Sequence, residues 1–393
     1  MLTTLGELAK RGELEFSDGY RTKGSEYAPS GYRIIRAGDV IGSCIDFSGP
    51  DFVSSTRRQA IGSKAVRPGD VVLTTKGTVG RTARVRGVPE PAVYSPQLCY
   101  FRPTTVRIDS GYLFHWFSSP EFVHQSTSMK SSTDMAPYIS LSQLAGTRIT
   151  LPPLPEQQAI AEVLGALDDK IAANRALVTS SVQLTESLFT RTTQGLVLAP
   201  LSSIAIVNGD TIKPRAGDLR YIDIAAVSTD DYASPTPRSW ANAPSRARRR
   251  VHHGDTLWST VRPNRRARAL VLEDDPTLVA STGLVTLSPR HQGFSFLHEA
   301  TRTGAFADYL VANAEGSAYP AVTASKFDRA PVPAADADTI VAFNRLTDPL
   351  WERVGSARAE ITTLASLRDT LLPALMDGTL RVKDAARVAS EVV

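Results

Sequence analysis

The chain has 393 residues, 42% hydrophobic and 21% charged, which is typical of a globular protein with room for two or more domains. Its two cysteines, Cys44 and Cys99, form no CxxC motif and lie near no histidine cluster, so we expect neither a disulfide framework nor a zinc site, and a cytoplasmic location. No apolar signal-peptide core follows Met1, and no apolar run approaches the ~20 residues that span a bilayer.

The formal net charge of +4 is small, but it is unevenly distributed along the chain. Residues 1–152 carry 18 Lys and Arg against 13 Asp and Glu, and residues 196–333 carry 16 against 13. Residues 153–195 carry 3 against 5, and residues 334–393 carry 7 against 9. Two basic regions therefore alternate with two mildly acidic ones, and a basic region is what a nucleic-acid backbone attracts.

The first region, residues 1–150, has the pattern of a mixed α and β lobe. Runs rich in β-branched residues lie beside Gly-Asp pairs, which mark turns, and they predict strands at Tyr32–Ile35, Val71–Thr75, Arg81–Val85 and Leu98–Arg102. Residues 111–119 and 120–129 are predicted to be helical.

Residues 151–195 predict one long helix, from about Glu156 to about Thr192. Prolines precede it, Glu156 suits the positive end of the helix dipole, and Gly195 follows it. Apolar residues share one face, namely Ile160, Leu164, Leu167 and Ile171, then Leu177, Leu184 and Leu188 after a phase slip near Asn174. Such a long helix with a narrow apolar stripe needs a partner helix.

Residues 196–333 repeat the plan of the first lobe at an offset of about 180–186 residues. VRPGDVVLTTKGTVGRTARV, at 66–85, matches VHHGDTLWSTVRPNRRARAL, at 251–270, through the shared Gly-Asp and the strand–turn–strand pattern. Identity outside such anchors is low. The two lobes are therefore expected to share a scaffold and differ in their loops, either because each reads something different or through neutral drift.

Residues 334–380 predict the partner helix, which again begins after prolines and ends at a glycine, Gly378. Its apolar stripe is formed by Phe343, Leu346, Leu350, Val354, Ala357, Ile361, Leu364 and Leu371. Pro349 removes one backbone hydrogen bond and is expected to kink or restart the helix. Residues 381–393 form a tail with no recognisable signature.

The segments LPPLPEQQAIAEVLGALDDKIAANRAL and LRDTLLPALMDGTLRV resemble the central and C-terminal helical regions of the specificity subunits of type I restriction-modification systems. The resemblance implies an α+β fold, with two target-recognition lobes joined by two long antiparallel helices in a coiled coil and an internal pseudo-twofold repeat. It also implies a non-catalytic subunit that reads a bipartite, asymmetric DNA site. Its expected partners are double-stranded DNA, two methyltransferase subunits and restriction subunits. S-adenosylmethionine, and ATP with Mg, would bind those partners and not this chain.

The residues themselves indicate no catalytic centre. The sequence contains no Asn/Asp-Pro-Pro-Tyr/Phe tetrapeptide, no GxGxxG after a strand and no GxxxxGK[ST]. His252 and His253 would point to opposite faces of a strand and would not jointly bind a metal. Asp168 and Asp169 are interpreted as solvated or partner-facing charges on the long helix.

The basic loops are the predicted DNA-binding residues, because arginine offers fork-shaped donors that fit phosphates and guanine edges. They are Arg57, Arg58, Lys76, Arg81 and Arg84 in the first lobe, and Arg246, Arg248, Arg249, Arg250, Arg262, Arg265, Arg266 and Arg268 in the second. Trp240 and Trp258 flank the second group and are interpreted as core residues.

The sequence thus predicts two recognition lobes, residues 1–150 and 196–333, with spacer helices at 151–195 and 334–380. The residues expected to hold the helices together or to meet partners are Ile160, Leu164, Leu167, Ile171, Leu350, Val354, Ile361 and Leu364. The alternative from another functional class is a stand-alone DNA-binding regulator or scaffold without a methyltransferase partner.

Overall fold

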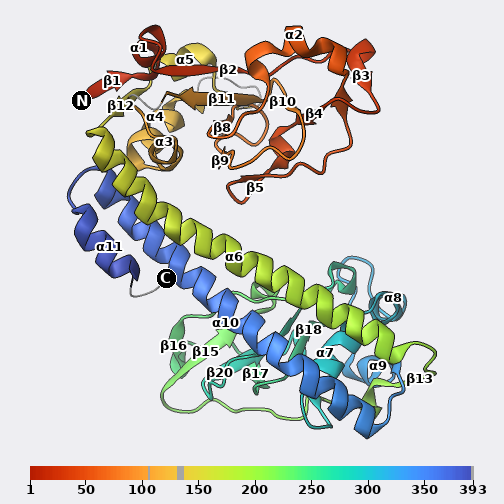
Figure 1. The fold of residues 1–393 in the computed structure, drawn as a ribbon. Helices are drawn as coiled ribbons and strands as arrows, with labels where there is room; N and C mark the ends of the chain where they lie inside the picture. The colour runs from red at the N-terminus through yellow and green to blue at the C-terminus, as the bar shows by residue number, and fades with distance from the viewer. Residues whose placement is uncertain (105–106, 131–136, 391–393) are drawn as a thin grey trace. The chain divides into compact units, whose positions relative to one another are not determined.

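A computed structural model describes residues 1–104, 107–130 and 137–390 of the chain. It divides into two compact units, Met1–Ala172 with Thr362–Val393, and Ala173–Ile361. Each unit combines one sheet-bearing lobe with a part of both long helices, as Figure 1 shows by colour along the chain. The mixed α/β class, with two lobes and two long helices, is therefore confirmed, whereas the domain boundaries drawn from the sequence stay predictions.

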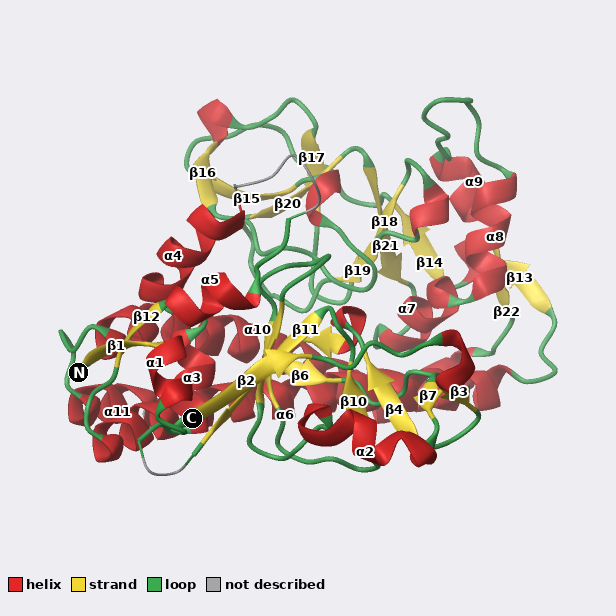
Figure 2. Cartoon of the chain, turned by 90° about the horizontal axis from the view of Figure 1, so that it is seen from above, coloured by secondary structure: helices red, strands yellow, loops and turns green. Residues whose placement is uncertain are grey.

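The first lobe is built on two four-stranded sheets. One sheet is antiparallel and has the order β2 (Leu14–Asp18), β11 (Leu98–Pro103), β8 (Val71–Thr74), β9 (Thr82–Arg84). The other has the order β10 (Ala92–Tyr94), β4 (Tyr32–Ile35), β7 (Phe52–Val53), β3 (Tyr27–Ala28), and β10 runs parallel to β4. Figure 2 shows β2 beside β11 and β4 beside β10. The four strands predicted from the sequence thus correspond to β4, β8, β9 and β11.

Short helices and strand pairs complete this lobe. They are β1 (Leu2–Thr4) paired with β12 (Arg148–Thr150), β5 (Val40–Ile41) paired with β6 (Cys44–Ile45), and helices α1 (Leu5–Lys10), α2 (Arg58–Ile61), α3 (Ser110–Trp116), α4 (Pro120–Lys130) and α5 (Leu141–Gly146). The residues predicted to be helical at 111–119 and 120–129 correspond to α3 and α4.

The second lobe repeats the antiparallel sheet of the first lobe, whereas its other sheet has a different strand order. Its antiparallel sheet has the order β14 (Ala205–Val207), β21 (Leu284–Pro289), β18 (Thr256–Ser259), β19 (Arg268–Leu270). Its other sheet has the order β16 (Pro237–Ser239), β15 (Asp218–Ile222), β20 (Leu278–Ser281), β17 (Ala247–Arg250), with β15 parallel to β20. The remaining elements are β13 (Leu198–Pro200), β22 (Pro331–Pro333), α7 (Ser295–Arg302), α8 (Gly304–Ala312) and α9 (Ala324–Asp328).

The Gly-Asp pair that marked the repeat builds the same turn in both lobes. Gly69 and Gly254 have φ angles of 87° and 86°, a left-handed conformation that glycine adopts without a steric penalty. The buried carboxylate of Asp70 accepts the backbone N–H of Arg67 at 2.9 Å, and that of Asp255 accepts the N–H of His252 at 2.8 Å. The repeated dipeptide is thus explained by a turn that introduces the central strand of each antiparallel sheet.

The long helices are α6 (Leu154–Thr193) and α10 (Ala337–Met376), of 40 residues each. Within the first unit, Arg368 Nη1 donates to Asp168 Oδ1 at 2.9 Å, and within the second, Asn174 Nδ2 donates to Glu360 Oε2 at 2.8 Å. From the first contact to the second, the residue of α6 advances from Asp168 to Asn174, whereas the residue of α10 goes back from Arg368 to Glu360. The two helices therefore pair antiparallel.

The buried face of α6 corrects two details of the predicted stripe. After Ile171 the buried positions are Asn174, Thr185 and Phe189, and the half-buried positions between Asn174 and Phe189 are Leu177, Val178, Ser181, Val182 and Leu188, so the face continues in steps of three or four residues. There is therefore no phase slip at Asn174, because a polar residue occupies the expected buried position. Leu184 lies off this face and is 48% exposed.

The helix α10 departs from its predicted stripe in the same way. Val354 and Leu364 are buried and Leu350 and Ile361 half-buried, but Leu346 is 67% exposed. Its place on the face is taken by Thr347, which is fully buried and donates its hydroxyl to the carbonyl of Phe343 at 2.8 Å.

A restart of the helix at Pro349, one of the two predicted effects, is absent, because α10 is continuous through that residue. Pro349 is exposed, so the carbonyl oxygen that loses its helical donor can be hydrated.

The tail contains a helix that the sequence analysis did not predict. This is α11 (Val382–Ser390), which buries Ala385 and Ala389, one turn apart. Small apolar residues at a spacing of four, among charged ones, were the available signal. None of the helices described here is both long and apolar enough to cross a membrane.

Candidate nucleic-acid interface

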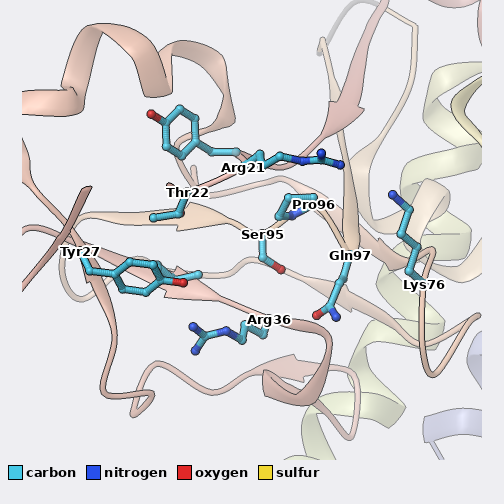
Figure 3. A pocket seen from close by; sticks show the side chains of 10 residues that line it. Arg21, Thr22, Tyr27, Arg36, Lys76, Ser95, Pro96 and Gln97 are labelled. Carbon is cyan, nitrogen blue, oxygen red and sulfur yellow. The ribbon is translucent and has the colours of Figure 1, made fainter. Parts of the chain in front are cut away.

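A pocket of about 370 Å³ lies in the first lobe, where several strands end. Its lining includes Arg21 after β2, Arg36 after β4, Lys76 after β8, and Ser95 and Gln97 in the turn from β10 to β11. Figure 3 shows these side chains around the hollow, with Lys76 and Gln97 on adjacent stretches of the chain. Loops at strand ends are exposed and rigidly supported, which is where binding residues concentrate.

Some side chains of this pocket are already paired within the protein. Arg36 Nη2 lies 2.7 Å from Asp51 Oδ2. The Tyr20 hydroxyl, also in the lining, donates to Glu26 Oε2 at 3.1 Å. Hydrogen bonds from the backbone N–H of Lys23 and from the Tyr20 hydroxyl hold the pKa of Glu26 below its usual range. These pairs fix one wall of the pocket.

The predicted first-lobe residues do not form one continuous surface. Arg57 Nε lies 3.2 Å from Glu26 Oε1, and Arg58 lines a different hollow with Tyr32 and Arg67. Only Lys76 belongs to the pocket described above.

Arg81 and Arg84 lie elsewhere in the first lobe. Arg81 is exposed, and its Nη1 donates to the carbonyl of Val40 at 3.4 Å. Arg84 lines a hollow along α6 that also contains Glu162 and Asp169, so its nearest charged surroundings are partly acidic.

Four predicted arginines of the second lobe lie in or beside β17. Arg246 is exposed, and Arg248, Arg249 and Arg250 are half-buried. Arg250 lies 3.7 Å from Asp210, and Arg248 Nη1 donates to the carbonyl of Ala247 at 2.7 Å. Burial lowers the pKa of the Arg249 guanidinium, and its Nε has no hydrogen-bond partner in the described part of the chain. The cluster therefore offers donors that internal contacts do not use up.

The turn from β18 to β19 carries three more predicted arginines. Arg262 and Arg266 have φ angles of 53° and 52°, a left-handed conformation that is uncommon for residues other than glycine and is often found at functional sites. The Arg262 guanidinium lies 4.8 Å from the ring centroid of the exposed Tyr319, and Arg266 lies 3.5 Å from Asp308. Arg265 is exposed between them.

Arg268 differs from the other predicted residues, because it is only 5% exposed. Its Nε lies 2.7 Å from Asp230 Oδ1, and its guanidinium lies 5.7 Å from the ring centroid of Trp258. A guanidinium that is buried and paired in this way cannot reach DNA. The prediction that Arg268 contacts DNA is therefore corrected, and we assign this residue a structural role. Trp240 and Trp258 are both buried, as their interpretation as core residues required.

The adjacent polar pairs His252-His253 and Asp168-Asp169 also have partners within the protein. His252 Nε2 lies 3.1 Å from Asp210, whereas His253 Nε2 lies 2.7 Å from Glu352, so the two rings do not converge. Within residues 1–104, 107–130 and 137–390, no group of three or more His, Cys, Asp or Glu side chains is arranged to hold a metal ion. Asp169 pairs with Arg86 and Asp168 with Arg368, so both aspartates face other parts of the protein.

The sequence analysis missed Arg21, Ser95 and Gln97. Ser95 corresponds to Ser281 of the second lobe when the repeat is aligned at an offset of 186 residues. Sequence reasoning could not bring these residues together, because Arg21 and Ser95 are more than 70 positions apart along the chain and meet only in the folded lobe. Superposing the two halves of the repeat on the anchors would have placed Gln97 opposite Gly283, which is the available signal.

Comparison with known proteins shows which proteins this chain is similar to. Residues 4–179 match the family described as the type I restriction modification DNA specificity domain. This match covers less than half of the chain, and it confirms the resemblance stated from the first helical motif, which lies within it.

Two curated relatives come from Methanocaldococcus jannaschii. The type I restriction enzyme MjaVIII specificity subunit is 26% identical over 166 residues, which cover 41% of this chain and 39% of the relative. The putative type I restriction enzyme MjaX specificity subunit is 26% identical over 148 residues, 36% of this chain and 34% of the relative. The matched part thus spans less than half the length of either relative.

A solved structure extends the likeness in fold to nearly the whole chain. The crystal structure of a type I restriction-modification system S subunit from M. genitalium covers 96% of both chains with a TM-score of 0.65 and 13% identity. At this identity, the match establishes a shared fold.

Proposed function

We propose that this chain is the DNA sequence-recognition subunit of a type I restriction-modification system, and that it reads a bipartite, asymmetric site with one part per lobe. The observation that carries the proposal is one antiparallel four-stranded sheet, of the same strand order, built twice with different residues in equivalent loops. The family match of residues 4–179 supports DNA as the ligand. A duplicated scaffold with divergent loops suits two different half-sites, since loops supply the contacts and the scaffold supplies their position.

The proposed partners follow from the same family. The helices α6 and α10 would dock two methyltransferase subunits, and restriction subunits would join that complex. S-adenosylmethionine, and ATP with Mg, would be bound by those partners. This chain would contribute no catalytic residue, in keeping with the absence of methyltransferase and nucleotide-binding motifs from its sequence.

Reconstitution tests this proposal. The purified chain is assayed for methyl transfer to DNA, first alone and then with the methyltransferase encoded beside it. We expect no methylation by the chain alone and adenine methylation at a bipartite sequence by the mixture. Robust methylation by the chain alone would contradict the non-catalytic role. Sequence-specific binding with no methylation by any mixture would instead favour a stand-alone regulator.

A further inference from the structure

The loop that carries Lys76 is fixed to the turn that carries Gln97. Thr75 donates both its backbone N–H and its hydroxyl to the carbonyl oxygen of Gln97, at 2.9 and 3.1 Å. The backbone N–H of Ile139 donates in turn to the carbonyl of Thr75 at 3.0 Å. Lys76 and Gln97 are therefore held next to each other in the lining of the first-lobe pocket (Figure 3).

The second lobe builds the same backbone frame with different side chains. Thr260 donates its backbone N–H and its hydroxyl to the carbonyl of Gly283, at 3.0 and 2.9 Å, and the N–H of Val322 donates to Thr260 at 2.8 Å. The positions of Lys76 and Gln97 are thus occupied by Val261 and Gly283. Since the frame is kept and the side chains are exchanged, the two lobes differ in chemistry at these two equivalent positions.

Three polar groups of the first-lobe pocket, those of Lys76, Gln97 and Ser95, are available to a ligand. Among the described residues, neither the Lys76 ammonium nor the Gln97 amide has an ion-pair or hydrogen-bond partner, and Gln97 is exposed. Ser95 lines the same pocket and is only 6% exposed, yet its Oγ has no hydrogen-bond partner in this part of the chain. A buried hydroxyl without a partner is costly, so this one marks a place where an outside group can bind.

We infer that this pocket reads base edges in the half-site of the first lobe, and that Lys76 and Gln97 are its specificity-determining residues. The inference rests on the proposed function, and it assigns base contacts to particular positions. Lys76 carries only donors, which match the O6 and N7 acceptors of guanine in the major groove. Gln97 offers one donor and one acceptor side by side, which match the N6 and N7 groups of an adjacent adenine.

The exchange in the second lobe gives the inference a further consequence. Val261 has no hydrogen-bonding side-chain group and Gly283 has no side chain, so this frame cannot select guanine or adenine in the same way there. The two lobes would therefore read different bases at equivalent positions, which accounts for an asymmetric site.

The test is a selection from random double-stranded DNA. The full chain is isolated from its host with its native partner subunits, as wild type and as Lys76→Met, Gln97→Ala and Lys10→Met. Lys10→Met is the matched control, since it removes an equal charge from an exposed lysine of α1 in the same unit. We expect Lys76→Met to lose about 5- to 100-fold of the preference for guanine at one position of one half-site. Gln97→Ala should relax the neighbouring position, and Lys10→Met should leave the motif unchanged.

The outcomes separate the inference from the proposed function. If the wild type selects no sequence, the proposed function fails. If the wild type selects a motif and Lys76→Met selects the same one with equal discrimination, the pocket is not the reading site, although the chain still recognises DNA. A uniform loss of affinity for all sequences would make Lys76 a phosphate contact and would also overturn the inference. Unchanged thermal unfolding of Lys76→Met, expected for an exposed side chain, shows that the variant is folded.

Discussion

Asn174 of α6 donates from Nδ2 to Oε2 of Glu360 of α10 at 2.8 Å, within the mainly apolar face along which these helices pair. Asn174 is only 3% exposed, between Ile171 and the half-buried Val178. A polar residue in such a face lowers stability but fixes the register, since any shift of the helices would leave the amide unpaired. This contact therefore defines how α6 and α10 align within the second unit.

A double-mutant cycle measures this contact. Asn174→Ala, Glu360→Ala and the double variant are compared with the wild type by chemical unfolding. We expect a coupling free energy of about 1–2 kcal/mol, because a hydrogen bond to a charged group exceeds a neutral one and this pair is partly buried. Additive effects of the two substitutions would mean that the amide and the carboxylate do not interact in solution.

The residues that sequence reasoning placed correctly are those with a regular spacing or a repeated anchor. Ile160, Leu164, Leu167 and Ile171 follow the helical period and are all buried, and the Gly-Asp pair marks the same turn in both lobes. Periodicity assigns buried positions to apolar residues, so it failed where polar residues occupy the buried face. Asn174 and Thr347 are buried with hydrogen-bond partners, which are the distant Glu360 for Asn174 and the carbonyl of Phe343, one turn earlier, for Thr347. An apolar periodicity takes account of neither kind of partner.

The candidate site shows a similar limit. Composition identified arginine-rich loops but did not distinguish the buried Arg268 from the exposed Arg265, two neighbours in one basic run. The difference depends on Asp230, which lies far away in sequence and pairs with Arg268. Likewise, the pocket of Lys76 and Gln97 depends on a turn contact between two strand ends, which no local pattern reveals.

The buried histidine of the first unit predicts a dependence of stability on pH. Desolvation, followed by the charges of Arg368, Arg84 and Arg86, lowers the pKa of His115 to about 3, although Asp168 lies 3.9 Å from its ring. His115 therefore takes up a proton near pH 6.5 in the unfolded chain, but only near pH 3 in the folded chain. We expect the contribution of His115 to stability to be fully present above pH 6.5. It should decline below that by up to about 1.4 kcal/mol per pH unit.

His115→Gln tests this pH dependence. Unfolding midpoints between pH 4 and pH 7 should fall less steeply for this variant than for the wild type. The exposed histidine of the same unit provides the matched control, since His124→Gln should keep the wild-type slope. Parallel curves for His115→Gln and the wild type would show that His115 is not the titrating group.

The arginines of the second lobe separate into two predicted classes. Arg246→Ala and Arg265→Ala remove exposed guanidinium groups and should each reduce the slope of log affinity against log salt by about 0.9, with little effect on stability. Arg353→Ala, on an exposed face of α10, is the matched control and should change neither quantity. DNA titrations across a salt series measure the slopes. An unchanged slope for both lobe variants would mean that these loops do not contact phosphate.

Arg268→Ala should behave in the opposite way. It removes the closest partner of Asp230, at 2.7 Å, but Arg302 remains 3.3 Å from the same carboxylate. The cost should therefore be below the about 3–5 kcal/mol that is typical when a buried charge loses its only partner. We still expect a drop in the unfolding midpoint and, in whatever fraction stays folded, the wild-type salt slope. A stable variant with a reduced slope would restore Arg268 as a DNA contact.

The last prediction concerns the gap between the two half-sites. If α6 and α10 act as the spacer, four residues inserted in α6 after Ala172 add about 6 Å, because a helix rises about 1.5 Å per residue. DNA rises about 3.4 Å per base pair, so the unspecified gap should lengthen by about one or two base pairs. The insertion also rotates the C-terminal part of α6 by about 40°, since four residues exceed one turn of 3.6, and one base pair rotates DNA by a similar amount. The bases read in each half-site should not change, because the residues proposed to contact them lie in the lobes. Mapping methylated adenines in a strain that carries the insertion measures both properties at once. A changed half-site with an unchanged gap would show that the helices do not set the spacing.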